Sequence, residues 1–153
     1  MSTSVLVVGI GNDYRCDDRV GLLVARAVQA RKGTHVRVLE SDGNCTTLLE
    51  AWQETRMVIL IDAICAGTTP GQIVRLDVHR QPLPSAYPFA SSHALGLAET
   101  IELARTLQQL PPKCLIYGIA GKDFSSGETL SPEVSGAIPV VVEQVIREAC
   151  SAS

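Results

Sequence analysis

The stretch Ser4-Val-Leu-Val-Val-Gly9 is a continuous apolar run that ends in glycine, close to the start of the 153-residue chain. A run that is apolar at every position is typical of a strand buried on both faces of a parallel sheet. After a loop, apolar residues recur with helical spacing, at Val20, Leu23, Val24, Ala27 and Val28. This spacing predicts a helix over residues 18–31, which Gly33 ends.

The rest of the chain continues the alternation of strands and helices. Met57 to Ile61 is a second continuous apolar run, followed directly by Asp62, and is expected to form another buried strand. The turn at Thr69-Pro-Gly71 leaves too few residues for a helical crossover, so the strand after it is expected to run antiparallel. The other expected elements are strands over 35–40, 71–78 and 114–119 and helices over 46–52, 93–109 and from 131 onward.

This order of elements predicts an α/β fold. The expected architecture is a three-layer α/β/α sandwich, with a mostly parallel five-stranded sheet that carries one antiparallel strand. One domain over residues 1–153 accounts for the whole length. In the last helix, Ser131 is expected to be the N-cap before Pro132, and Pro139 to kink or divide the helix.

Composition excludes several classes of function. Hydrophobic residues make up 46% of the chain and charged residues 19%, which favours a folded domain over disorder. A net charge of −3 without a cluster of basic residues argues against a nucleic-acid partner. No apolar run reaches the roughly 20 residues that span a bilayer, and no signal peptide is apparent, so no membrane insertion is expected. The five cysteines lack metal or disulfide spacing, which indicates reduced thiols and a cytoplasmic protein.

The loop after the first strand carries adjacent acids. Its Gly-Ile-Gly start is similar to a dinucleotide-binding fingerprint, and Glu40 imitates the acid that holds a ribose. However, Tyr14 replaces the third glycine, and Asp17 and Asp18 would repel a pyrophosphate at the helix start. Either acid could cap the helix. Because two adjacent carboxylates repel each other unless a cation compensates, a metal or catalytic role is the other interpretation.

Further candidate residues lie in other loops at the carboxyl ends of the strands, where ligands bind in such sheets. Asp62, at the end of a buried strand, must either be paired, for example by closing a loop, or face the crevice. His93, at the expected start of a helix, is either a surface histidine or a metal ligand. Asp18, Asp62 and His93 together would suit Ni, Mn, Fe or Zn. Asp42, before Gly43, is either a turn residue or a further acid at this edge.

Familiar hydrolase signatures are absent from the sequence. It contains no HExxH, GxSxG or Asp-Thr/Ser-Gly motif, so a zinc, serine or paired-lobe aspartic protease is not indicated. Cys16 or Cys65 could approach His93 in space, although burial as small hydrophobic residues is the favoured interpretation. No catalytic duty is expected for His35 or His79.

The motifs resemble those of the maturation endopeptidases of [NiFe] hydrogenases. The resemblance covers essentially the whole chain and departs from the family at Arg19, where glycine is common, and at Ala120-Gly121, where Glu-Pro is frequent. The matching segments are Val7 to Asn12, Asp17-Asp18, Gly21, Asp42-Gly43, Ile61 to Ala63, Ser91 to His93, Tyr117 to Ile119 and Leu130 to Val134.

The resemblance implies an α/β/α peptidase that acts late in hydrogenase assembly. Its partner would be a [NiFe] hydrogenase large-subunit precursor, which loses a C-terminal extension after nickel has been inserted. Asp18, Asp62 and His93 would recognise nickel supplied by that precursor and take part in catalysis, with Asp42 as a further catalytic candidate. The free protein is expected to be a monomer. A Rossmann-like nucleotide-binding module and a nickel chaperone that does not cleave are the alternative functions.

Overall fold

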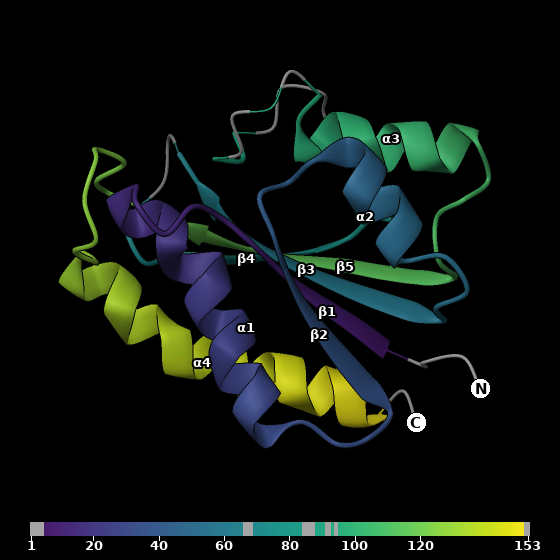
Figure 1. Ribbon diagram of the computed structural model, residues 1–153, viewed down its shortest axis with the longest axis horizontal. Coiled ribbons are helices and arrows are strands. Elements are labelled where there is room, and N and C mark those ends of the chain that lie inside the picture. Colours follow the sequence, from purple (N-terminus) through teal and green to yellow (C-terminus); the bar gives the residue numbers. More distant parts are fainter. Residues whose placement is uncertain (1–4, 66–68, 84–87, 91–92, 94, 152–153) are drawn as a thin grey trace.

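The computed structural model describes residues 5–65, 69–83, 88–90, 93 and 95–151. They form a sheet between two layers of helices (Figure 1). The strands are β1 (Val5–Ile10), β2 (Val36–Ser41), β3 (Met57–Ile64), β4 (Ile73–Asp77) and β5 (Lys113–Ala120). The helices are α1 (Val20–Arg31), α2 (Cys45–Ala51), α3 (Leu97–Thr106) and α4 (Pro132–Ser151), with a 3-10 turn, η1 (Cys16–Arg19), before α1.

The sheet has the predicted topology. Its strand order is β2-β1-β3-β5-β4. β1 pairs in parallel with β2 and β3, and β3 pairs in parallel with β5. β4 is antiparallel to β5, so both the α/β fold class and the single antiparallel strand are confirmed among the described residues.

Each face of the sheet is covered by its own pair of helices. In β1, Val5 and Val7 pack on the side of α1 and α4, whereas Leu6 and Val8 pack on the side of α2 and α3. Figure 1 shows these two helical layers on opposite sides of the sheet. The two-sided cover explains why the first strand is apolar at every position.

Two expected boundaries near the candidate residues differ from the structure. β3 continues to Ile64, so Asp62 lies inside the strand and not after it. α3 begins at Leu97 because Gly96 caps it, with the Gly96 N–H donating to Glu99 Oε2 at 2.6 Å. His93 therefore precedes the helix and lies outside its first turn. α4 starts at Pro132 as expected and is assigned as one helix through Pro139.

No helix in the described part of the chain combines the length and the apolar character needed to cross a bilayer.

Candidate active site

Glycines bring the start of α1 against the ends of the central strands. A Cβ at Gly21 would lie 2.3 Å from the Ile10 carbonyl oxygen, and one at Gly11 would lie 2.1 Å from the Asp18 carbonyl oxygen. Gly11 in the loop and Gly21 in the first turn of α1 are thus required for close backbone packing. Glu40, which resembles the ribose-binding acid of dinucleotide folds, instead accepts hydrogen bonds from Arg26 Nε at 3.1 Å and Arg26 Nη2 at 2.8 Å. These contacts weigh against the nucleotide-binding alternative.

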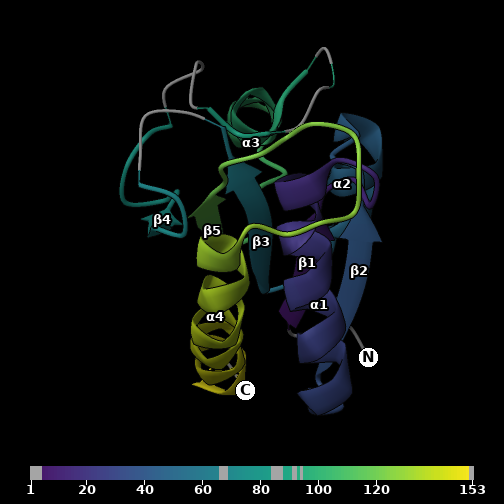
Figure 2. The same ribbon diagram turned by 90° about the vertical axis from the view of Figure 1, so that its left-hand side faces the viewer.

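Asp17 anchors the loop between β5 and α4. Its buried carboxylate accepts hydrogen bonds from the backbone N–H groups of Lys122 at 2.7 Å, Asp123 at 2.8 Å and Ser131 at 2.7 Å. The Ser131 hydroxyl also donates to the Asp17 carboxylate, at 2.7 Å, and so helps to hold this loop in place. Figure 2 shows this loop reaching across to the η1 end of α1. Asp17 therefore has a structural role, which sequence spacing alone did not reveal.

Asp18, the neighbouring acid, is buried but poorly paired. Only 3% of the residue is exposed. Its Oδ2 lies 3.4 Å from Arg15 Nη1, and its Oδ1 has no hydrogen-bond partner among the described residues. Burial raises the pKa of Asp18 to about 6, against the lowering effect of the Arg15 charge. Burial thus brings the pKa of this acid into the range that favours proton exchange near neutral pH.

Asp62 is the second acid of the pair and is fully buried in β3. Its Oδ1 accepts a hydrogen bond from the Ala63 N–H at 2.8 Å, whereas its Oδ2 has no partner in the described structure. Burial first, and the charge of Asp18 second, raise the pKa of Asp62 well above its usual range. Two carboxylates that repel each other in this way favour retention of a proton or uptake of a cation.

The fold lowers the pKa of Asp17 and raises the pKa of Asp18. Replacing each acid by asparagine should therefore change the stability of the protein in opposite directions. Asp18→Asn should raise the free energy of unfolding by up to about 3 kcal/mol above pH 6, because the buried charge is removed. The pKa of Asp18 is higher in the folded chain than in the unfolded chain, so its contribution to stability is present below about pH 4 and is lost as the pH rises through the folded-state pKa. The difference in stability between Asp18→Asn and wild type should therefore vanish in acid.

Asp17→Asn is the matched control, and it should lower stability at neutral pH by about 1–3 kcal/mol. Burial alone would raise the pKa of Asp17, but hydrogen bonds from Ser131, Asp123 and Lys122 lower it, so its charge contributes stability above pH 3.8 that is lost in acid. Urea unfolding between pH 3.5 and 8 measures both effects. Destabilisation by Asp18→Asn at pH 8 would contradict the assignment of Asp18 as an underpaired charge.

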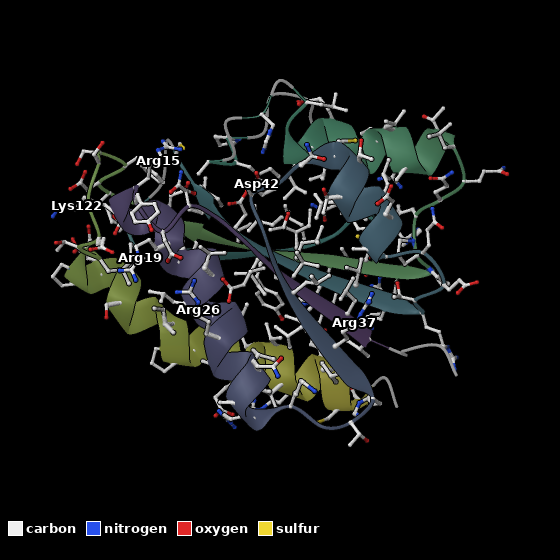
Figure 3. The ribbon with its side chains drawn as sticks, in the orientation of Figure 1. Arg15, Arg19, Arg26, Arg37, Asp42 and Lys122 are labelled. Carbon is white, nitrogen blue, oxygen red and sulfur yellow. The ribbon has the colours of Figure 1, made fainter. Side chains whose placement is uncertain are left out.

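His93 pairs with Asp42 and not with the two buried acids. His93 Nε2 lies 3.2 Å from Asp42 Oδ1, and Asp42 Oδ1 also accepts a hydrogen bond from the Asn44 N–H at 3.1 Å. Asp42 lies on the loop that follows β2 (Figure 3). Both interpretations of Asp42 therefore apply, since it shapes a turn and adds an acid at this edge. Ser91 and Ser92 of the Ser-Ser-His motif lie outside the described residues.

The segment before His93 is attached to the end of β3. The Ala90 N–H donates to the Ala63 carbonyl oxygen at 2.9 Å, and Phe89 forms an antiparallel bridge with Ile64. These contacts bring the chain that carries His93 to the edge where Asp62 lies. Within the described ranges, however, no three His, Cys, Asp or Glu side chains are arranged to hold a metal ion. The expected set of Asp18, Asp62 and His93 is thus not preassembled.

The two acids nevertheless fit part of a metal coordination shell. Asp18 Oδ1 and Asp62 Oδ2 are both buried and unpartnered in the described structure, and carboxylate oxygens are ordinary ligands of divalent metals. Two oxygen donors without thiolates would leave most coordination positions of a metal ion to other ligands.

Arg15 is a residue of this site that sequence reasoning missed. Its guanidinium contacts Asp18 and lies over the Phe124 ring, 5.9 Å from the centroid. Figure 3 places Arg15 near the loop that carries Lys122. The available signal was an arginine three residues before one of the adjacent acids.

The cysteine and histidine alternatives receive little support. Cys16 is buried as expected, with Sγ 3.9 Å from Ser125 Oγ, whereas Cys65 is exposed. Partial desolvation, opposed by the Arg15 charge and reinforced by Asp62 and Asp18, nevertheless raises the pKa of the Cys65 thiol, which disfavours the nucleophilic thiolate. His35 and His79 each bond to a backbone carbonyl oxygen, of Ala149 at 3.0 Å and of Pro111 at 2.6 Å, which agrees with structural roles.

Comparison with known proteins gives a consistent result. A family model described as hydrogenase maturation protease matches residues 22–148. The hydrogenase expression/formation protein HupD of Rhodobacter capsulatus is 29% identical over 150 residues, which cover 94% of this chain and 70% of that protein. The hydrogenase 2 maturation protease of Escherichia coli (strain K12) is 26% identical over 145 residues, covering 93% of this chain and 88% of that protein. The solved structure of the hydrogenase maturating endopeptidase HybD from E. coli has a TM-score of 0.83 at 25% identity, covering 97% of this chain and 93% of that one.

Proposed function

Because the chain belongs to the hydrogenase maturation protease family, we propose that it removes the C-terminal extension of a [NiFe] hydrogenase large-subunit precursor after nickel insertion. Membership of this family means that the chain is a peptidase of hydrogenase maturation. The substrate, the bond cleaved and the use of nickel are the proposal. We place this reaction in the cytoplasm and expect the free protein to be a monomer.

The observation that carries the proposal is the buried carboxylate pair. Asp18 Oδ1 and Asp62 Oδ2 are unpartnered in the described chain, and they can accept the nickel that the precursor presents, with His93 as a nitrogen donor. Asp42 holds the His93 ring at 3.2 Å, and this contact fixes the nitrogen that the ring can offer. Docking of the substrate's metal against these groups would bring the neighbouring peptide bond to the edge of the sheet.

The same acids can move the protons that peptide hydrolysis requires. A water molecule adds to the carbonyl carbon and loses a proton, the C–N bond breaks, and the departing amine gains a proton. A carboxyl group with a pKa near 6, such as Asp18, is suited to accept the first proton and return it to the amine.

Mass spectrometry of the precursor distinguishes the peptidase from a chaperone that holds nickel without cleaving. Incubation of nickel-loaded precursor with the protein should shorten the precursor at its C-terminus, with release of one discrete peptide. Precursor incubated without the protein is the control for spontaneous cleavage. An intact precursor whose nickel has passed to the added protein would favour the chaperone and reject the proposed peptidase.

A further inference from the structure

Arg15 is the cation nearest to Asp18 among the contacts of the described structure. Its Nη1 lies 3.4 Å from Asp18 Oδ2, and its Nε lies 3.4 Å from the Phe124 carbonyl oxygen. Nη1 also lies 3.5 Å from the Ala90 carbonyl oxygen. The guanidinium thus touches the first loop, the segment before His93 and the loop after β5.

The arginine is more exposed than the buried acid that it contacts. Its side chain is 32% exposed, whereas the Asp18 side chain is 5% exposed. Arg15 is therefore the partly exposed member of this ion pair, and it places a positive charge beside the buried acid. The aromatic ring of Phe124 beneath the guanidinium supports the arginine in this place.

Arg15 is held more loosely than another arginine in the same region. Its polar contacts are all 3.4–3.5 Å long. Arg26 instead bonds through Nη2 to Asp13 and to Glu40, both at 2.8 Å. Long contacts to one carboxylate oxygen and two carbonyl oxygens can be exchanged for solvent at small cost.

We propose that Arg15 is a selectivity residue that acts as the resident cation of the Asp18–Asp62 pair. It partly balances the charge of Asp18 in the free protein and disfavours free divalent ions, and it moves towards solvent when the substrate's metal centre docks. This inference rests on the proposed function. Arg15 contacts Asp18 only at Oδ2 and leaves Asp18 Oδ1 and Asp62 Oδ2 unpartnered in the described structure, so both oxygens are available to a docked metal centre that brings ligands of its own.

Titration with Ni²⁺ alone tests the inference without any precursor. Isothermal titration calorimetry on Arg15→Gln should give an affinity for Ni²⁺ at least about tenfold higher than that of wild type, because a like charge next to the bound ion is removed. Arg15→Lys, which keeps the charge, should stay within about threefold of wild type. Arg19→Gln is the matched control, since Arg19 lies in the same loop but bonds to Asp13 at 3.3 Å.

Two further measurements make the result specific. Adding Asp62→Asn to Arg15→Gln should abolish the gain in affinity, which would assign the gain to the carboxylate pair. Arg15→Met provides a second uncharged side chain, and circular dichroism verifies that each variant is folded. Unchanged or weaker Ni²⁺ binding by folded Arg15→Gln and Arg15→Met would overturn the inference, because Arg15 would then support the site and not compete for it.

The precursor assay separates this inference from the proposed function. Cleavage of nickel-loaded precursor by the wild-type protein, without any gain in Ni²⁺ affinity in Arg15→Gln, rejects only the role of Arg15. A tenfold gain in a protein that never cleaves precursor rejects the proposed peptidase and retains Arg15 as the resident cation of a metal-accepting pair.

Discussion

Asp62→Asn should fold normally and cleave nickel-loaded precursor at about one-thousandth of the wild-type rate or less. The side chain is fully buried in β3, and only its Oδ1 is used by the fold, as acceptor for the Ala63 N–H at 2.8 Å. Asparagine keeps this carbonyl acceptor and the shape of the side chain. It removes the charge, the titratable proton and the second carboxylate oxygen, which are the properties that the proposed reaction uses.

The stability of the Asp62→Asn protein makes this test specific. Because burial and the Asp18 charge raise the pKa of Asp62 well above its usual value, a neutral side chain should be at least as stable there at neutral pH. Cleavage rates from mass spectrometry are therefore to be compared with urea unfolding of the same samples. Wild-type cleavage by the folded variant, or by the residual folded molecules of an unfolding variant, would reject Asp62 as a catalytic residue.

His93→Ala provides a companion measurement at the exposed edge. The His93 side chain is 34% exposed and is paired with Asp42, so its removal should change stability by only about 0.5 kcal/mol. Loss of cleavage at preserved stability would then assign His93 to the reaction. His79→Ala is the control histidine, since His79 bonds to the Pro111 carbonyl oxygen and is expected to leave cleavage unchanged.

The fold followed from sequence because its signals are local and strong. Continuous apolar runs predicted β1 and β3, and the short turn before Ile73 predicted the antiparallel β4. Boundaries were harder, since they depend on partners distant in sequence. β3 extends past Asp62 because Asp62, Ala63 and Ile64 pair with Gly118, Ile119 and Ala120 of β5, and no pattern within β3 reports that pairing.

The candidate site was predicted only in part, for the same reason. The loop after the first strand pointed to Asp18 and the end of an apolar run pointed to Asp62, and the charge of Asp18 contributes to the raised pKa of Asp62. Sequence could not separate Asp17 from Asp18, because what distinguishes them is the distant loop that donates to Asp17 through Lys122, Asp123 and Ser131. It also gave no reason to connect Arg15 with Ala90 and Phe124, which lie 75 and 109 residues away in the chain.

A precursor that lacks nickel should resist cleavage even with excess protein, whereas a nickel-loaded precursor should be cleaved without added metal. The expected difference in rate is about a thousandfold or more, because the substrate's metal would supply both the docking contact and charge stabilisation near the scissile bond. The physical reason lies in the incompleteness of the protein's own site. Asp18 and Asp62 offer two unpartnered oxygens, and the described chain assembles no third donor with them.

The decisive comparison uses one precursor preparation divided into nickel-loaded and nickel-free halves, each incubated with chelator-treated protein and followed by mass spectrometry of the C-terminus. Adding Ni²⁺ to the protein alone, followed by removal of excess metal, should not rescue cleavage of the nickel-free half, because two buried carboxylates retain a free ion weakly. Equal and rapid cleavage of both halves would reject nickel recognition and leave the acid pair as a metal-independent centre. Rescue by pretreatment of the protein would show that the metal belongs to the peptidase, and Asp18, Asp62 and His93 would then have to form a complete site once the ion is bound.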